Sequence, residues 1–99
     1  MKIVVLGGGE SGFGAAYLAK KKGLEVLLSD KGLIKDDYKK LLTDAGIEFE
    51  EGKHDDERIL AADWIIKSPG IPKKAEIISK INRKGIRLSS EIEFASEFT

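Results

Sequence analysis

Short apolar runs divide the chain at regular intervals and predict five β-strands. Three of the runs have a continuous apolar centre, as in strands that are buried on both faces of a parallel sheet. Another alternates isoleucine and phenylalanine with two glutamates, which indicates an edge strand with one face in water. The predicted strands cover residues 3–6, 25–29, 47–50, 63–67 and 86–88.

Between these runs, apolar residues recur at helical spacing and predict five helices. Leu18 belongs to the first apolar stripe, and Gly23 follows it, where a left-handed residue commonly ends a helix. Pro72 suits the first turn of the fourth helix, because the amide hydrogen that proline lacks would have no partner there. Ser90 and Glu93 have the spacing of a capping box at the start of the last helix. The predicted helices cover residues 11–22, 36–45, 56–61, 72–84 and 90–98.

Strands that alternate with helices form parallel βαβ units with right-handed crossovers. We therefore predict an α/β fold, namely a Rossmann-like, doubly wound sheet of five parallel strands in the order 3-2-1-4-5, with helices on both faces. In such a sheet, ligands bind in the crevice over the carboxyl ends of the strands where the order reverses, here between strands 1 and 4. The loops at residues 7–12 and 68–70 both reach that crevice, so we place the site there.

The loop after the first predicted strand has the spacing G-x-G-x-x-G at Gly7, Gly9 and Gly12. In nucleotide-binding folds the first glycine allows a tight turn, the second lets a phosphate approach the backbone, and the third lets the helix pack closely. We expect the backbone amides of Glu10, Ser11 and Gly12 to point at an anion, assisted by the positive end of the helix dipole. Glu10 fits such a site if its carboxylate points to solvent.

Asp30 and the segment Ser68-Pro69-Gly70 complete the predicted site. Asp30 ends the second strand about 20 residues after the glycine motif, where an acid binds the ribose hydroxyls in dinucleotide enzymes. Capping of a turn by Asp30, beside Lys31 and Gly32, is the alternative. In the second loop, prolines fix the backbone and Gly70 lets it approach a ligand, although a rigid connector between strand and helix would have the same residues.

Composition excludes several other classes of protein. Ninety-nine residues, 41% hydrophobic and 34% charged, suit one globular domain, which we take as residues 1–99. Seventeen lysines and arginines balance seventeen aspartates and glutamates, so bulk charge favours neither nucleic acid nor an anionic membrane as a partner. The chain has no cysteine, which excludes disulfides and thiolate metal sites. No apolar run approaches the length of a membrane span or resembles a secretory signal, so we expect a cytoplasmic protein.

Several short motifs together resemble a known family, the N-terminal domain of the Mur ligases. Within that family they are most similar to the branch of the UDP-N-acetylmuramoyl-L-alanine:D-glutamate ligases, and the resemblance covers essentially the whole chain. The motifs near residues 70 and 90 are the specific ones, because many folds share the glycine motif. In chain order they are GGGESG at 7–12, SD at 29–30, GKH at 52–54, SPGIP at 68–72 and SEIEF at 90–94.

The resemblance implies that this domain binds the UDP part of UDP-N-acetylmuramoyl-L-alanine. The motifs assign one group of residues to the diphosphate, one to the uracil end and one to the far side of the crevice. These groups are Gly9, Glu10, Ser11 and Gly12, then Asp30 and Lys31, then Ser68, Pro69 and Gly70.

The resemblance also implies what lies outside this domain. Ligases of this family have a central ATP-binding domain and a C-terminal domain, and the sequence contains no G-x-x-x-x-G-K-[ST] motif. We therefore expect an N-terminal domain that binds no cofactor itself and is inactive alone. The whole enzyme of peptidoglycan-precursor synthesis would use ATP and Mg²⁺ to convert the alanyl carboxylate to an acyl phosphate, which D-glutamate attacks. Its partners would be the UDP substrate and its own other domains.

Two other functions stay open. The glycine loop and Asp30 also fit an NAD(P)-binding Rossmann module of a dehydrogenase or a regulatory protein. Alternatively, the domain is a folded scaffold without measurable affinity, because one domain supplies few contacts to offset the cost of association. His54, the only histidine, has no cysteine or second histidine with which to share a metal, so we expect it in a loop or at the edge of a pocket.

Overall fold

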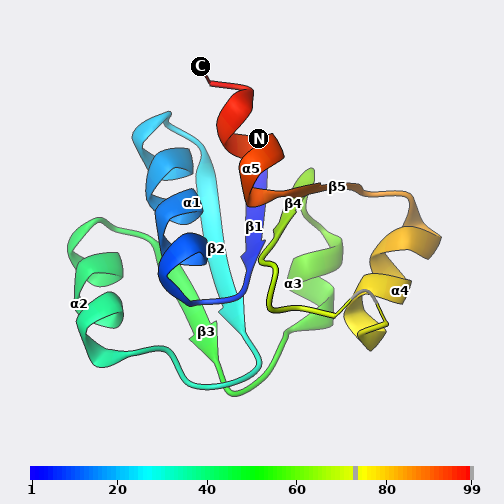
Figure 1. Cartoon of the computed structure of the whole chain (residues 1–99), viewed down its shortest axis with the longest axis horizontal. Coiled ribbons are helices and arrows are strands. Elements are labelled where there is room, and N and C mark those ends of the chain that lie inside the picture. The colour runs from blue at the N-terminus through cyan, green and yellow to red at the C-terminus, as the bar shows by residue number, and fades with distance from the viewer. Residues whose placement is uncertain (73, 99) are drawn as a thin grey trace.

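The structure is a computed structural model that describes residues 1–72 and 74–98. Within these residues, five strands alternate with five helices along the chain (Figure 1). The strands are β1 (Lys2–Leu6), β2 (Glu25–Asp30), β3 (Glu48–Glu51), β4 (Trp64–Lys67) and β5 (Arg87–Ser90). The helices are α1 (Glu10–Lys21), α2 (Asp36–Asp44), α3 (Asp56–Leu60), α4 (Glu76–Lys84) and α5 (Glu91–Ser96).

The strands form one sheet in the order β3-β2-β1-β4-β5, and every neighbouring pair is parallel. This confirms the predicted fold class and strand order. β1 lies at the centre, where Val4 is in register with Leu27 of β2 and Ile65 of β4. Because β1 and β4 are neighbours, the loops that follow them leave the sheet side by side, and this juxtaposition positions the site.

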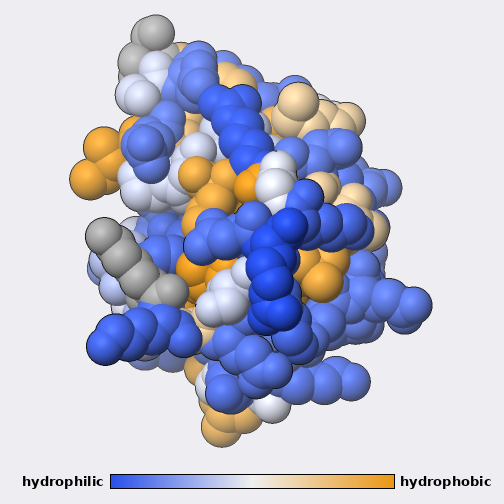
Figure 2. Space-filling view, turned by 90° about the vertical axis from the view of Figure 1, so that its right-hand side faces the viewer, coloured by the Kyte–Doolittle hydropathy of each residue, from blue (hydrophilic) through white to orange (hydrophobic). Residues whose placement is uncertain are grey.

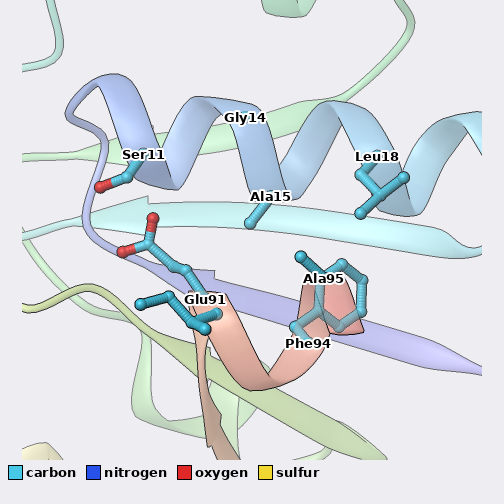
Figure 3. A pocket seen from close by; sticks show the side chains of 8 residues that line it. Ser11, Gly14, Ala15, Leu18, Glu91, Phe94 and Ala95 are labelled. Atoms are coloured by element: carbon cyan, nitrogen blue, oxygen red, sulfur yellow. The ribbon is translucent and has the colours of Figure 1, made fainter. Parts of the chain in front are cut away.

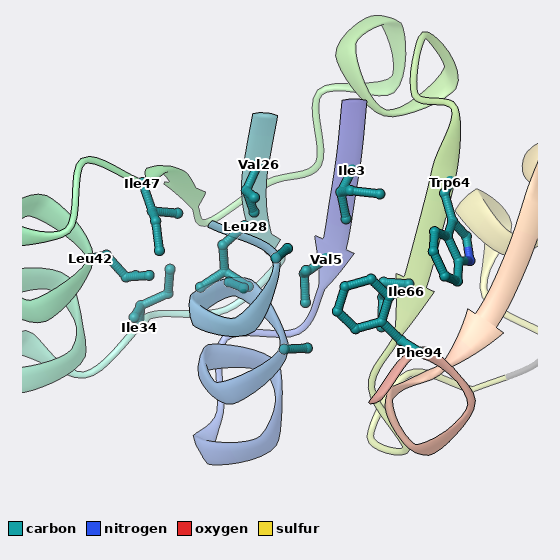
Figure 4. Close-up of a cluster of buried hydrophobic side chains, with 13 residues drawn as sticks. Ile3, Val5, Val26, Leu28, Ile34, Leu42, Ile47, Trp64, Ile66 and Phe94 are labelled. Atoms are coloured by element: carbon teal, nitrogen blue, oxygen red, sulfur yellow. The ribbon is translucent and has the colours of Figure 1, made fainter. Parts of the chain in front are cut away.

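Alternate residues of the strands supply two apolar layers, one on each face of the sheet. Figure 4 shows the first layer, in which Val5, Leu28 and Ile66 are packed together with Phe94 of α5. α1, α2 and α5 contribute buried residues to this layer, whereas α3 and α4 contribute to the second, which includes Val4 and Leu6. The period of two along each strand therefore fixes which helices cover which face.

Local capping explains where several helices begin and end. The capping box predicted at α5 is formed, since the Ser90 amide donates to Glu93 Oε1 at 2.7 Å and the Glu93 amide donates to Ser90 Oγ at 3.1 Å. Asp55 caps α3 by accepting from the Arg58 amide. Gly23 follows the C-cap of α1 with a φ of +80°, as its predicted role requires.

The start of the fourth helix was predicted wrongly. α4 begins at Glu76, with Ala75 as its N-cap, and not at Pro72. Two successive turns occupy the preceding segment, in which the Ile71 amide donates to the Ser68 carbonyl and the Ala75 amide donates to the Pro72 carbonyl. Residue 73, within this segment, lies outside the described part of the chain. The other predicted boundaries lie within about two residues of those observed.

The surface over α4 and β5 is mainly hydrophilic. Figure 2 shows this side of the molecule, where hydrophobic atoms are visible in gaps between polar side chains. Over residues 1–72 and 74–98, no helix has both the length and the apolar character of a transmembrane segment. Trp64 is buried, at 4% exposure, and Phe98 packs on Phe94, with ring centroids 5.1 Å apart.

Replacing Phe94 with alanine tests how much α5 contributes to stability. Phe94 is fully buried and packs edge to face against Trp64, with ring centroids 4.9 Å apart. We expect Phe94→Ala to lower the free energy of unfolding by about 3–5 kcal/mol, because it removes buried area and leaves a cavity. Urea denaturation followed by the fluorescence of the single tryptophan measures it. The control is Ile92→Ala on the same helix, where the side chain is 82% exposed and a change within about 0.5 kcal/mol is expected. Equal losses in both variants would contradict the packing described.

Candidate functional site

The turn between β1 and α1 has no room for side chains at several of its glycines, of which Gly7 and Gly12 belong to the predicted motif. Gly7 has a φ of +107°, a conformation that favours glycine, and its amide donates to the Ser29 carbonyl at 2.8 Å. A Cβ atom on Gly12 would lie 1.8 Å from the carbonyl oxygen of Gly7. Both residues are therefore required by the shape of the turn, as the motif predicts.

Gly9 differs from these two, because nothing in the fold requires a glycine there. It has an ordinary φ of −75°, and apart from Gly9 itself and its neighbours along the chain no described atom lies within 4 Å of the position that its Cβ would occupy. Gly9 is the N-cap of α1, and its carbonyl accepts the first helical hydrogen bond, from Phe13. The amides of Glu10, Ser11 and Gly12 precede that bond, so they belong to the set of helix amides without helical partners. The open space over Gly9 thus gives access to the positive end of α1.

The turn touches the loop after β4. A Cβ atom on Gly7 would lie 2.6 Å from the Cβ of Ser68, and the Ser68 amide donates to the Leu6 carbonyl at 2.9 Å. The Lys67 ammonium braces this loop by donating to the carbonyls of Ser68 and Ile71, at 3.4 and 2.8 Å. The two loops expected to share the crevice are therefore in contact.

Asp30 joins the glycine turn to the loop after β2. Its Oδ2 accepts from the Gly8 amide at 2.7 Å, and its Oδ1 accepts from the Gly32 amide at 2.9 Å. The turn-capping alternative raised for Asp30 is thus present in the structure, and the two amides compensate the charge of the carboxylate. Each carboxylate oxygen of Asp30 keeps a further lone pair, so it could still accept a hydrogen bond from a nucleoside. That contact stays a prediction.

The loop after β2 is also held by β3. Glu51 Oε1 accepts from the Ile34 amide at 2.9 Å, and its Oε2 accepts from Lys39 Nζ at 2.9 Å. The amide hydrogen bond, and after it the lysine, lower the pKa of Glu51 below its ordinary value. The Gly52 amide donates to the Gly32 carbonyl at 2.8 Å, so the loop that carries Lys31 is tied to the neighbouring strand.

Two acidic residues lie near the first turn of α1, and they differ in exposure. Glu10 is exposed, which is the condition that an anion site at this turn requires of it. Glu91, the first residue of α5, has both carboxylate oxygens buried without a hydrogen-bond partner in the described chain. Figure 3 shows its carboxylate pointing toward Ser11, beside a cavity of about 250 Å³ between α1 and α5. The sequence gives no sign of this position for Glu91, because an acidic residue in the first turn of a helix is common.

A larger cavity, of about 600 Å³, lies among the loops that follow β2, β3 and β4. Lys31 lines it, and Ile71 connects it to the glycine turn, since a Cβ on Gly7 would lie 3.9 Å from the Ile71 side chain. Its volume is within the usual range for small-molecule sites. The lining combines apolar residues with charged ones, and it includes Pro72, Ala75, Lys53, His54 and Lys80.

The lysines that line this cavity differ in whether they form ion pairs with the protein. Lys80 forms ion pairs with Asp56 and Glu76. Lys31 and Lys53 form no ion pair with any residue in the described ranges, so their charges are available to an anionic ligand. His54 lies at the edge of the cavity, as expected, and the motif GKH was the signal for it and Lys53.

The structure brings the predicted site residues into two adjoining groups. The glycine turn, Asp30 and Ser68 lie in direct contact, whereas Lys31 faces the larger cavity. Pro69 and Gly70 are exposed at the tip of their loop, and the Gly70 amide donates to Ser68 Oγ at 3.4 Å. Ligand contact by each of these residues stays a prediction.

Comparison with known proteins identifies a family. A family model described as the MurD N-terminal domain matches residues 2–77. A relative from Christiangramia forsetii, a UDP-N-acetylmuramoylalanine–D-glutamate ligase, is 59% identical over 98 residues, which are 99% of this chain and 22% of that protein. The chain thus spans about a fifth of the length of such relatives.

Solved structures agree with the sequence comparison. A murein peptide ligase from Psychrobacter arcticus superposes with a TM-score of 0.88 at 28% identity, over 98% of this chain and 20% of that one. A minor L-lactate dehydrogenase from Enterococcus mundtii has a TM-score of 0.55 at 18% identity, over 90% of this chain and 37% of that one. The second likeness shows the fold alone.

Asp30→Ala tests whether this carboxylate holds the two loops. We expect a loss of about 1–3 kcal/mol in the free energy of unfolding, because the Gly8 and Gly32 amides lose their acceptor. Urea denaturation measures the loss, and faster hydrogen exchange at the Gly8 amide locates it. Asp44→Ala is the matched control, since Asp44 is exposed and a change within about 0.5 kcal/mol is expected. An Asp30 variant as stable as the control would show that the carboxylate is dispensable.

Proposed function

The chain belongs to the MurD N-terminal domain family, and we propose that it binds the UDP moiety of UDP-N-acetylmuramoyl-L-alanine. The observation that carries the proposal is the uncapped start of α1, which opens over Gly9 directly beside the loop after β4. A diphosphate at this point would accept hydrogen bonds from the amides of Glu10, Ser11 and Gly12. The partial positive charge of the helix N-terminus would favour it further.

The larger cavity supports a nucleoside beyond the diphosphate. It adjoins the glycine turn through Ile71 and continues to Lys31, the residue that follows Asp30. Apolar atoms of Ile71 and Pro72 provide surface for a flat base, and the unpaired lysines suit an anionic ligand. These features support our proposal that the nucleotide binds with its phosphates at α1 and its base toward the loops after β2 and β3.

The proposed activity of the whole protein goes beyond this chain. By likeness to relatives named UDP-N-acetylmuramoylalanine–D-glutamate ligases, we propose an enzyme of peptidoglycan-precursor synthesis that joins D-glutamate to the alanyl carboxylate. Domains outside these 99 residues would use ATP and Mg²⁺ to convert the alanyl carboxylate to an acyl phosphate. The contribution of this chain would be to hold the UDP end and orient the substrate, and we expect no catalysis by the chain alone.

An NAD(P)-binding module remains the competing function, because the same fold serves dehydrogenases. The position of Asp30 is the specific feature in its favour, since an acid at the end of the second strand binds ribose in that class. The two functions predict different ligands at the glycine turn, UDP or NAD(P), so a binding measurement with each ligand distinguishes between them.

Titration of the 99-residue chain with UDP and with NAD, followed by amide NMR, tests the proposal. We expect UDP to shift the amides of residues 7–12 and 68–70 with a dissociation constant of about 1 mM, and NAD to shift them less. Gly9→Val should abolish these shifts, because its side chain would fill the space above the first turn, while the fold is retained. NAD shifting these amides more than UDP would favour the dinucleotide module. If Gly9→Val bound UDP as tightly as the parent does, the assignment of the phosphates to the turn at Gly9 would be wrong.

Glu91→Gln tests the charge beside the proposed phosphate site. The buried carboxylate points toward Ser11, so its removal should relieve repulsion of the diphosphate and tighten UDP binding several-fold. Glu10→Gln is the matched control at the same turn, where exposure to solvent screens the charge and little change is expected. The same titration measures both. An unchanged affinity in Glu91→Gln would place the phosphates away from α1.

A further inference from the structure

The end of β2 holds the ring of His54 by one of its nitrogens. Ser29 is fully buried, and its Oγ lies 2.7 Å from His54 Nδ1. The same Oγ donates a short hydrogen bond to Glu50 Oε2, which also accepts from the Asp55 amide at 2.8 Å. Three polar groups from β2, β3 and the following loop are thus linked in series, and the last of them, His54, lines the larger cavity.

Counting hydrogens in this series determines the tautomer of His54. A serine hydroxyl has one hydrogen, and an ionised carboxylate has none to give. The Ser29 hydrogen is directed to Glu50, so Ser29 Oγ can only accept from the imidazole. Nδ1 of His54 therefore carries a hydrogen, and in the neutral ring the other nitrogen, Nε2, has a free lone pair.

Nε2 is free to meet a ligand. It has no hydrogen-bond partner among residues 1–72 and 74–98, and it is not one of the buried polar atoms left without a partner, so it is open to solvent. His54 lines the cavity of about 600 Å³ that also contains Lys31 and Pro72. His54 thus keeps an unused hydrogen-bond acceptor that is open to solvent, on a residue that lines this cavity.

The surroundings of His54 favour the neutral ring. Burial lowers its pKa below the ordinary value of 6.5, and it outweighs the nearby carboxylates of Glu50, Asp30 and Asp56, while Lys31 acts in the same direction as burial. The other charged groups that line the cavity are Lys53, Glu76 and Lys80.

We propose that His54 Nε2 accepts a hydrogen bond from the nucleoside end of the bound nucleotide and that His54 thereby selects a ligand with an N–H or O–H donor at this point. This inference rests on the proposed function and adds a specificity residue to it. The imide N–H of uracil and the ribose hydroxyls are the donors that a uridine nucleotide offers. Phosphate oxygens are excluded as partners of Nε2, because two acceptors cannot share a hydrogen bond.

The tautomer can be measured without a ligand. The chain has one histidine, so the ¹⁵N spectrum of its imidazole is free of overlap. We expect the neutral ring to carry its hydrogen on Nδ1, and Ser29→Ala to lose this preference because the serine acceptor is gone. A parent protein with the hydrogen on Nε2 would overturn the proposal, since no acceptor would then face the cavity.

The decisive measurement is the pKa of His54 with and without UDP-glucose, whose phosphates stay singly ionised where histidine titrates. A ligand that donates to the neutral ring must lower this pKa, and UDP-glucose must then bind more weakly as the pH falls through it. An unchanged pKa would overturn the proposal. A raised pKa would also overturn it, because it would show an imidazolium bound to phosphate. N3-methyl-UDP-glucose and 2′-deoxy-UDP-glucose identify whether the imide or the ribose is the donor.

Variants separate this proposal from the proposed function. His54→Ala should weaken UDP-glucose by about three- to tenfold and abolish the pH dependence, while the amide shifts of residues 7–12 at saturation are retained. Lys53→Ala, which removes a cation from the same wall, should keep the pH dependence. Parental affinity and pH dependence in His54→Ala would overturn the role of His54 and leave UDP binding at the glycine turn intact. Absence of any shift at residues 7–12 in the parent would overturn both proposals.

Discussion

Backbone contact in the first turn, where side chains have no room, is the constraint on which the rest of the structure depends. Gly12 packs on the Gly7 carbonyl, Gly7 packs on Ser68, and a Cβ on Gly8 would lie 2.8 Å from the Ile34 side chain. The turn can therefore lie against the loops after β2 and β4 at once. With side chains at these positions, α1 could not start so close to the end of β1, and its amides would not face the crevice between β1 and β4.

The last two residues of β2, Ser29 and Asp30, each hold a different part of the proposed site in place. Successive strand residues point to opposite faces, so Ser29 and Asp30 act on different parts of the crevice. Asp30 holds the glycine turn through the Gly8 amide, and Ser29 holds the ring of His54 beside the larger cavity. The two halves of the proposed nucleotide site, for phosphates and nucleoside, are in this way fixed relative to each other by β2, which lies between β3 and β1 in the sheet.

The proposed anion site relies on helix amides, and the acids around it are placed accordingly. Asp30 is compensated by two amides, Glu10 is in solvent, and the buried carboxylate oxygens of the half-buried Glu91 point toward Ser11 in the first turn of α1 (Figure 3). A carboxylate there is stabilised by the helix dipole, which is the same interaction that would bind a phosphate. Glu91 therefore occupies an electrostatic environment that would also suit the proposed ligand.

The sequence by itself determined the fold class, the strand order and the position of the glycine turn, because these follow from apolar periodicity and from residues whose backbone preferences are local. Gly7, Gly23 and the pair Ser90 and Glu93 illustrate this, since each acts within a few residues of itself. The tertiary structure alone decided the start of α4, where two turns replace the expected first helical turn. It also decided the hydrogen bond between Asp30 and the Gly8 amide, and the surroundings of His54 and Glu91. Asp30 and Gly8 are 22 residues apart and Ser29 and His54 are 25 residues apart, while Ser11 and Glu91 come from opposite ends of the chain. No local pattern in the sequence records such contacts.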